Sequence, residues 1–420
     1  MTVAPVAAKN VRGGTASAPS LQSHVRDYLQ RLRGGDMGSL PAIAGLGVLC
    51  IVFTLLDDAF ATPRNFANLF GQGAQTTVIA MGLVFVLLLG EIDLSAGYTS
   101  GVCAAVMAIL LTNEGWPWYL AVLAALVTGT VIGLVLGTLV AKIGIPSFVV
   151  TLAAFLGFQG VLLIMLGGGK NISINDDVIL ALVNKNLPVW LGWALCLVAI
   201  LGYAVVQLYR AQARTRQGLV AQPMSVILLK IGAVAVVLLL ATLVLNQERS
   251  INTLITSLKG VPIVVPIIAI LLIIGTFVLS RTAFGRHLYA VGGNTEAARR
   301  AGIPVDRIKI AAFMISSTMA AVGGVLVASR ANSVDPNTGG SNVLLYAVGA
   351  AVIGGTSLFG GKGRMMDAVL GGAVVAVIDN GMGLLGYSSG VKYIVTGAVL
   401  LLAAGVDALS RRRAAASGLG

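Results

Sequence analysis

The sequence has little charge. Only 10% of its 420 residues are Asp, Glu, Lys or Arg, whereas 57% are hydrophobic. A globular domain in water has about 25% charged residues, because its surface must be solvated. The composition therefore excludes a soluble globule of this size and predicts a membrane protein. Apolar runs near the roughly 20 residues needed to cross a hydrocarbon core recur along most of the chain, which predicts an all-α, polytopic helical bundle.

Histidine and cysteine are also scarce. His24 and His287 lie alone in basic stretches, and Cys50, Cys103 and Cys196 each lie in a different apolar run. This spacing matches neither a metal site nor a disulfide framework. Because no histidine lies in a span, Ser-His-Asp catalysis would have no base within the membrane. We therefore expect no enzymatic activity, no metal and no cofactor.

A phosphate-binding loop of the form GxxxxGK[ST] is missing. The nearest segment, GTSLFGGKG at Gly355–Gly363, places Lys362 one position late and follows it with glycine. The chain cannot hydrolyse ATP by that route. Energy for any transport must come from a partner or from an ion gradient.

Twelve apolar segments are predicted as membrane helices, at about 40–57, 73–90, 95–112, 117–141, 146–166, 189–209, 226–246, 260–280, 308–330, 342–359, 366–387 and 391–409. The pair around Glu91 and the Gly-rich run at 342–359 are expected to be broken or re-entrant, so the bundle has about 10–12 transmembrane helices. This divides the chain into a tail (1–39), a membrane domain (40–410) and a second tail (411–420). Residues 21–33, LQSHVRDYLQRLR, suit either a short basic amphipathic helix on the membrane surface or a solvated leader.

The basic residues are distributed unevenly. If the N-terminus is cytoplasmic, 21 of the 28 Lys and Arg residues fall on the cytoplasmic side of the predicted spans. This bias follows the positive-inside rule and predicts a multi-pass membrane protein with an even number of spans and both termini in the cytoplasm. The net charge of +12 then reflects topology and contact with anionic lipids, and no nucleic-acid partner is needed to explain it.

Small residues recur within one span: Gly129, Gly133 and Gly137 are each four residues apart. Glycine at this spacing lets two helix backbones approach closely in lipid. We expect tight helix packing there.

Few ionisable groups lie near the predicted membrane interior. Glu91 and Asp93 fall at a segment boundary, where Asp93 or Ser95 can cap the next helix, whereas an ion-coupled transporter would use such groups as ion sites. Asp379 lies inside a span beside Asn380, and this pair either lines a solute path or forms hydrogen bonds between helices. Both interpretations remain open.

A path for a polar solute needs polar groups for hydrogen bonds and can use aromatic rings for stacking. The residues that meet this description near the membrane interior are Phe155, Phe158, Gln159, Asp379 and Asn380.

The stretch GGNTEAARRAGIP, Gly292 to Pro304, contains a short charged helix between apolar segments. Asn294 or Thr295 can cap it, Glu296 lies in its first turn, and Arg299 and Arg300 lie in its last turn, where the helix dipole favours cations. Gly302 and Pro304 then end it. A helix of about two turns is marginal alone in water, so it must pack on something. Either a cytoplasmic partner or the chain's own bundle can provide that surface.

Several motifs carry a family resemblance. The run RTAFGRHLYAVGGNTEAARRAGIPVDRIK (281–309) resembles the cytoplasmic loop of the permease subunits of bacterial ABC importers for monosaccharides, of the ribose and xylose type. GEIDLSAG (90–97), IPSFVVTLA (145–153), VIGGTSLFGG (352–361) and DNGMGLLG (379–386) resemble further signatures of this family in the same order. The extra span near 226–246 and the GEIDLS and DNGM forms are most similar to the D-xylose permeases.

The resemblance implies a permease homodimer, two cytoplasmic ABC ATPase subunits, and an extracytoplasmic sugar-binding protein. The loop 281–307 would then carry the coupling helix that inserts into the ATPase, through Asn294, Thr295, Glu296, Ala297, Ala298, Arg299, Arg300 and Gly302. Glu91, Asp93 and Ser95 would belong to a family signature. The implied function is import of a monosaccharide, D-xylose or a similar sugar, and an ion-gradient-coupled transporter is the alternative. Where relatives often carry an acidic run, this chain has LLYAVGA (344–350), a difference that bears on which sugar is moved.

Overall fold

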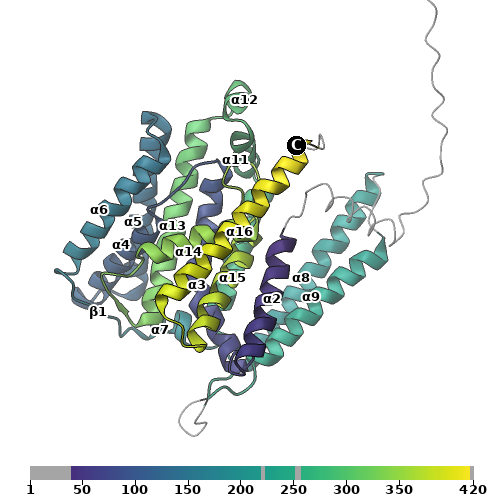
Figure 1. Cartoon of the computed structure of the whole chain (residues 1–420), viewed down its shortest axis with the longest axis horizontal. Coiled ribbons are helices and arrows are strands. Elements are labelled where there is room, and N and C mark those ends of the chain that lie inside the picture. The colour runs from purple at the N-terminus through teal and green to yellow at the C-terminus, as the bar shows by residue number, and fades with distance from the viewer. Residues whose placement is uncertain (1–38, 219–222, 251–256, 417–420) are drawn as a thin grey trace, which may run out of the picture.

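The computed structural model describes residues 39–218, 223–250 and 257–416, which form a bundle of α-helices with one short β-ladder (Figure 1). The amphipathic segment expected at 21–33 lies outside the described residues. At the other end of the chain, the last helix continues to Ala416, so the beginning of the tail expected at 411–420 is helical.

The helices follow one another with short connections. The long ones are α2 (Leu40–Leu56), α3 (Pro63–Leu88), α5 (Trp118–Thr138), α6 (Ser147–Met165), α8 (Val189–Arg216), α9 (Met224–Leu245), α10 (Val264–Arg281), α13 (Val305–Ala331), α15 (Met365–Leu384) and α16 (Ser389–Ala416). The shorter ones are α4 (Ala96–Ala108), α7 (Asp177–Asn184), α11 (Ala283–Gly293), α12 (Thr295–Arg300) and α14 (Ser341–Gly354). Two π-helical turns, η1 (Ile109–Asn113) and η2 (Leu139–Ile143), extend α4 and α5, and β1 (Ile172–Ser173) pairs antiparallel with β2 (Ser333–Val334).

Nine helices in the described part of the chain, with α4 and α5 counted through their π-helical turns, are long and apolar enough to cross a membrane. Three shorter apolar stretches, Leu40–Leu56, Asn342–Gly354 and Ser389–Leu402, complete the set. The chain is therefore a multi-pass membrane protein, and each of the twelve expected segments coincides with a helix. The largest difference in a boundary is at α3, which begins at Pro63, ten residues before the expected start, because Thr62 accepts a hydrogen bond from the Asn65 N–H at 3.3 Å and caps the helix.

The core of the bundle surrounds α3, whose residues from 76 to 88 are all buried. Helices α4, α13, α14 and α15 pack around it, and α5 packs on the outer side of α13. The three glycines of α5 lie against this neighbour: a Cβ on Gly129, Gly133 or Gly137 would contact the backbone of α13. The expected close packing of small residues in lipid is thus confirmed.

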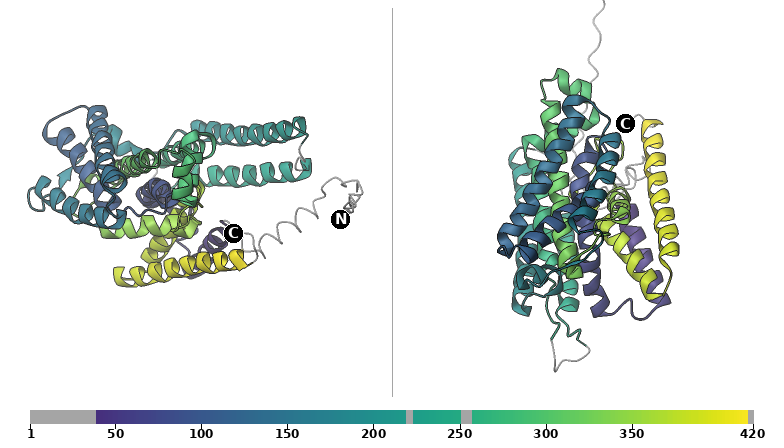
Figure 2. Two further views of the ribbon diagram at one scale, coloured as in Figure 1. Left: turned by 90° about the horizontal axis from the view of Figure 1, so that it is seen from above. Right: turned by 90° about the vertical axis from the view of Figure 1, so that its left-hand side faces the viewer.

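The α8–α9 hairpin lies at the edge of the molecule. Figure 2 shows the two helices projecting from the rest of the bundle, and most of their side chains are exposed. The exposed large apolar side chains are mostly Leu and Val, including Leu197, Val198, Val237 and Leu240. An apolar exposed face of this kind is expected where a helix meets lipid.

Two helices, α4 and α14, begin at non-helical backbone inside the bundle instead of at its surface. We call them the discontinuous helices. Helix α4 follows the non-helical connection 89–95, and α14, with 14 residues or about 21 Å, is too short to cross a hydrocarbon core of about 30 Å. Both begin inside the bundle and lie next to one another there, because Gly97 in the first turn of α4 faces the carbonyl oxygens of Gly339 and Gly340 that precede α14. The expectation of broken helices in these two regions is confirmed. Non-helical backbone at this depth is buried in protein, as the membrane requires.

Candidate coupling segment and polar sites

The segment around α12 protrudes at one end of the bundle, which we call the α12 end; β1 and α7 lie near the opposite end (Figure 1). Asn294 caps α12, because its Oδ1 accepts a hydrogen bond from the Ala297 N–H at 2.9 Å. Glu296 pairs with Arg300 at 3.4 Å on the exposed surface. Gly302 adopts φ +81° immediately after the helix. Capping by Asn294 and the glycine stop agree with the sequence prediction.

The two faces of α12 differ in how far they are buried. Ala298 is 5% exposed and packs in the core of the chain's own bundle, so its methyl group is turned away from any partner. Thr295 is half-buried and donates a hydrogen bond to the Val291 carbonyl oxygen at 3.0 Å. The remaining expected coupling residues are exposed, namely Asn294, Glu296, Ala297, Arg299, Arg300 and Gly302. One face of α12 is therefore held by the permease itself, and the other is open.

Asp93 lies at the start of α4 and is almost completely buried. Its carboxylate accepts hydrogen bonds from the Ser95 N–H at 3.0 Å, the Ser95 hydroxyl at 2.6 Å and the Ser316 hydroxyl at 2.9 Å. The Ser95 side chain, at the N-cap position of α4, makes no cap to the helix; instead Ser95 donates to Asp93 through both its N–H and its hydroxyl. These bonds also join the beginning of α4 to the middle of α13.

The rest of the connection 89–95 is held from two sides. Glu91 forms an ion pair with Lys309 of α13 at 2.5 Å, and both side chains are mostly buried. The N–H of Ile92 donates to the Ser147 hydroxyl at 3.2 Å, and the Thr151 hydroxyl donates to the Ile92 carbonyl oxygen at 3.2 Å. The GEIDLSAG and IPSFVVTLA motifs, which are separate in sequence, thus bind one another directly.

Asp379 and Asn380 are neighbours in α15 but have different surroundings. Asn380 exchanges two side-chain hydrogen bonds of 2.8 Å with Asn65 and donates to Gln72 at 3.1 Å, all within the buried contact with α3. Asp379 is half-exposed and lies 3.6 Å from the Lys392 ammonium of α16. Asn380 therefore forms hydrogen bonds between helices, which was one of the two interpretations of this pair. The Asp379 side chain faces a different set of groups.

These groups form what we call the Asp379 cluster, composed of Arg330, Asn342, Tyr346, Asp379, Lys392 and Tyr393. Arg330 and Tyr346 both lie within electrostatic range of the Asp379 carboxylate. The Asn342 side-chain amide donates to the Tyr393 hydroxyl at 2.5 Å. Four helices supply the cluster, so sequence analysis identified only Asp379. Tyr346 also belongs to a segment that the sequence had singled out, the run LLYAVGA.

The aromatic residues predicted for a sugar path lie apart from the Asp379 cluster. Phe155 of α6 makes an edge-to-face contact with Tyr98 of α4, with ring centroids 4.8 Å apart. Phe158 and Gln159 are also half-buried on α6. Helix α6 packs against α4, whereas α15 packs against α3 and α14, so a single chain does not bring Phe155, Phe158 and Gln159 together with Asp379 (Figure 1).

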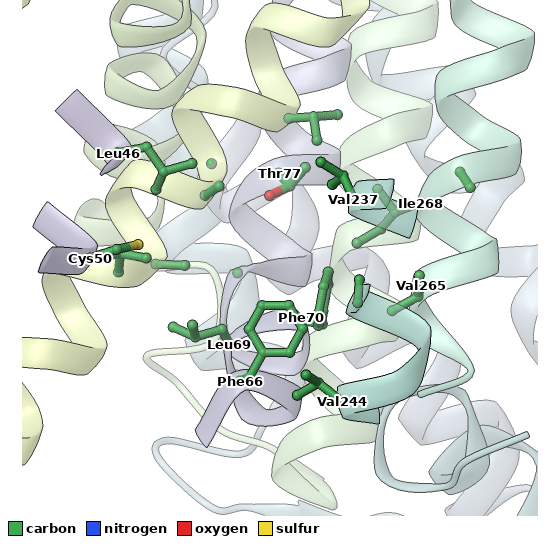
Figure 3. A pocket seen from close by; sticks show the side chains of 18 of the residues that line it. Leu46, Cys50, Phe66, Leu69, Phe70, Thr77, Val237, Val244, Val265 and Ile268 are labelled. Atoms are coloured by element: carbon green, nitrogen blue, oxygen red, sulfur yellow. The ribbon is translucent and has the colours of Figure 1, made fainter. Parts of the chain in front are cut away.

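A half-open cavity of about 740 Å³ lies between α2, α3, α9, α10 and α15 (Figure 3). Its walls are apolar, as Phe66, Phe70 and Val237 illustrate, and Thr77 has the one hydroxyl among the lining side chains. A sugar needs several convergent donors and acceptors, which this cavity lacks. The apolar lining of this cavity is suited to contact with hydrocarbon chains. Among the described residues there is also no group of three or more His, Cys, Asp or Glu side chains placed to hold a metal ion.

The architecture defines a helical membrane permease with two discontinuous helices and a capped protrusion at one end. Residues 65–404 match the family described as the permease component of branched-chain amino acid transport systems, and the chain belongs to this family. It is 37% identical to the xylose transport system permease protein XylH of Escherichia coli (strain K12) over 373 residues, which cover 88% of this chain and 92% of that protein.

Two further relatives extend the comparison. XylH of Haemophilus influenzae is 33% identical, over 88% of this chain and 96% of its own length. The ribose import permease protein RbsC of Escherichia coli (strain K12) is 29% identical, over 87% of this chain and 92% of its own. No solved structure matches the chain. These relatives support the ABC importer permease over the ion-gradient-coupled transporter.

Proposed function

We propose that this permease moves a monosaccharide, D-xylose or a similar sugar, into the cytoplasm, and that a separate ABC ATPase subunit hydrolyses the ATP. The observation that carries the proposal is the 37% identity to a xylose permease along 88% of the chain. The lack of a GxxxxGK[ST] loop in the sequence supports a division of labour in which this chain does not hydrolyse nucleotide.

The proposed assembly is a permease homodimer with two ATPase subunits and an extracytoplasmic sugar-binding protein. The exposed face of α12 is the proposed ATPase contact, with the guanidinium groups of Arg299 and Arg300 on its surface. The α12 end is then cytoplasmic, together with both termini, in a bacterial inner membrane. The clustering of Arg and Lys on the predicted cytoplasmic side supports this orientation.

For the sugar path we propose the Asp379 cluster. It offers a carboxylate, two phenol hydroxyls, an amide and two cations, which are the kinds of donors and acceptors that sugar hydroxyls require. Asn380 is excluded from direct contact, because its amide is already used by Asn65 and Gln72. Phe155, Phe158 and Gln159 are proposed as a separate surface of the path on α6.

Reconstitution tests this proposal. Proteoliposomes that contain the permease, its ATPase and its binding protein should accumulate radiolabelled D-xylose only when ATP is present on the ATPase side. Vesicles with the permease alone should show no uptake under a proton or sodium gradient. Gradient-driven uptake without ATPase would overturn the proposal, and competition by other pentoses and hexoses would identify the preferred sugar.

A further inference from the structure

Backbone atoms from three chain segments contact one another at the α12 end. We call this contact the glycine junction, and it consists of Gly90, Gly292, Gly360, Gly361 and the Leu88 carbonyl. The Gly361 N–H donates a hydrogen bond to the Leu88 carbonyl oxygen at 2.9 Å. Gly292 lies so close to this bond that a Cβ there would collide with the Leu88 carbonyl oxygen and the Gly361 nitrogen. Gly90 has φ +75°, which only glycine adopts without strain, and lies against the Phe359 carbonyl.

Each of the three segments belongs to a different functional part of the chain. Gly292 is in the last turn of α11, two residues before Asn294 caps α12. Gly90 begins the connection 89–95 that leads into α4. Gly360 and Gly361 lie in the connection 355–364 between α14 and α15. The coupling segment therefore contacts the connections to both discontinuous helices at one point.

The first turn of α4 also contacts the backbone that precedes α14. Gly97 of α4 faces the Gly339 and Gly340 carbonyls before α14, and Gly101, one turn later, faces the Thr338 carbonyl. The bonds of Asp93 and Ile92 hold the intervening connection against α13 and α6. The connection 89–95 and helix α14 thus link the glycine junction to a second backbone contact inside the bundle.

We propose that the glycine junction transmits the displacement of α12 to α4 and α14, so that Gly292 is a positioning residue for transport. Contacts between bare backbones have no side chains whose rotamers could absorb a movement, so a shift at the end of α11 must move Leu88 or Gly361. Small shifts at one site become larger rearrangements when they act on discrete packed elements of this kind. This inference rests on the proposed function, in which an ATPase moves α12.

Neighbouring glycines in the chain provide a matched test. An alanine Cβ at Gly292 collides with two backbone atoms of the junction, whereas one at Gly293 has nothing within 4 Å. Gly292→Ala and Gly293→Ala make the same chemical change in the same helical turn. Both variants are reconstituted with the ATPase and the binding protein, and sugar uptake, ATP hydrolysis and ATPase co-purification are measured.

We expect Gly293→Ala to behave as wild type. Gly292→Ala should still co-purify with the ATPase and hydrolyse ATP, but the sugar moved per ATP hydrolysed should fall at least tenfold. An unchanged transport-to-hydrolysis ratio in Gly292→Ala would overturn the inference. A wild-type complex that shows no ATP-dependent uptake would instead overturn the proposed function, and with it this inference.

Hydrogen–deuterium exchange on the wild-type complex tests the same inference if Gly292→Ala fails to fold. When the ATPase is trapped with ATP and vanadate, exchange in residues 88–95 and 355–361 should change together with exchange in residues 294–302. A change confined to 294–302 would show that the movement of α12 does not pass through the junction.

Discussion

The hydroxyl of Ser316 donates a hydrogen bond of 2.9 Å to the carboxylate of Asp93, and this contact joins the start of α4 to α13. Two further bonds from Ser95 complete the surroundings of the carboxylate. A carboxylate buried in a membrane protein needs such partners, because removing it from water without them costs several kcal/mol. Asp93 therefore stabilises the position at which α4 begins.

Replacement of Asp93 by alanine is expected to destabilise the permease. It would leave the hydroxyls of Ser95 and Ser316 buried without an acceptor, at a cost of about 1–3 kcal/mol each. Thermal unfolding in detergent should show a clear fall in Tm. Asp58→Ala, at an exposed position near the end of α2, is the control and should leave the Tm unchanged. Equal melting temperatures for the two variants would contradict the anchoring role.

Substitution of Asn380 should lower stability, whereas substitution of Asp379 should lower sugar uptake. Asn380→Ala leaves the amides of Asn65 and Gln72 without their partner, so we expect it to lower stability by about 1–3 kcal/mol. Asp379→Asn keeps the shape of a half-exposed side chain but removes its charge, so it should reduce sugar uptake and leave the Tm nearly unchanged. Uptake in proteoliposomes and thermal unfolding separate the two effects. Normal uptake in Asp379→Asn would remove this residue from the proposed path.

A methyl group at Gly133 should disturb the packing of α5 on α13. Its Cβ would overlap the Phe313 carbonyl and the backbone of Met314, whereas a Cβ at Gly157 of α6 has open space around it. Gly133→Ala should therefore destabilise the protein by about 1–3 kcal/mol through overpacking. Gly157→Ala should be neutral or slightly stabilising, because alanine favours the helix. Thermal unfolding of both variants checks the difference, and a stable Gly133→Ala would argue against close packing.

The loop after α9 should be sensitive to strong acid. Hydrogen bonds from the Leu258 N–H, the Ser257 hydroxyl and the Ser250 N–H lower the pKa of Glu248 from 4.5 to about 2. A carboxyl group whose folded pKa is depressed stabilises the loop fully above pH 4.5, and this contribution is lost as the pH falls toward 2. The protection factor of the Leu258 N–H, which is its intrinsic exchange rate at each pH divided by the measured rate, should fall across that window.

Glu248→Gln is the matched variant for this loop. Its neutral amide does not titrate in acid, so the fall in the protection factor of Leu258 between pH 4.5 and pH 2 should disappear. A protection factor of Leu258 that does not change with pH in the wild type would contradict the assigned role of the carboxylate.

The sequence by itself determined that this chain lies in a membrane and where most of its helices are. Transfer of apolar side chains from water to lipid depends on local composition, so runs of Leu, Val and Ile identify spans without knowledge of their neighbours. Local chemistry also predicted the cap at Asn294 and the left-handed stop at Gly302. The close packing of Gly133 could be predicted because the spacing of small residues is itself a local pattern.

Only the tertiary structure decided which surfaces these helices share. Asp379 and Asn380 are adjacent in sequence, but consecutive residues in a helix point about 100° apart, so one faces α3 and the other faces α16. Ala298 faces inward for the same reason. The contact between Leu88 and Gly361 joins segments more than 270 residues apart, and no periodicity or propensity encodes it. Such contacts depend on how whole helices pack against one another, and that is a property of the complete bundle.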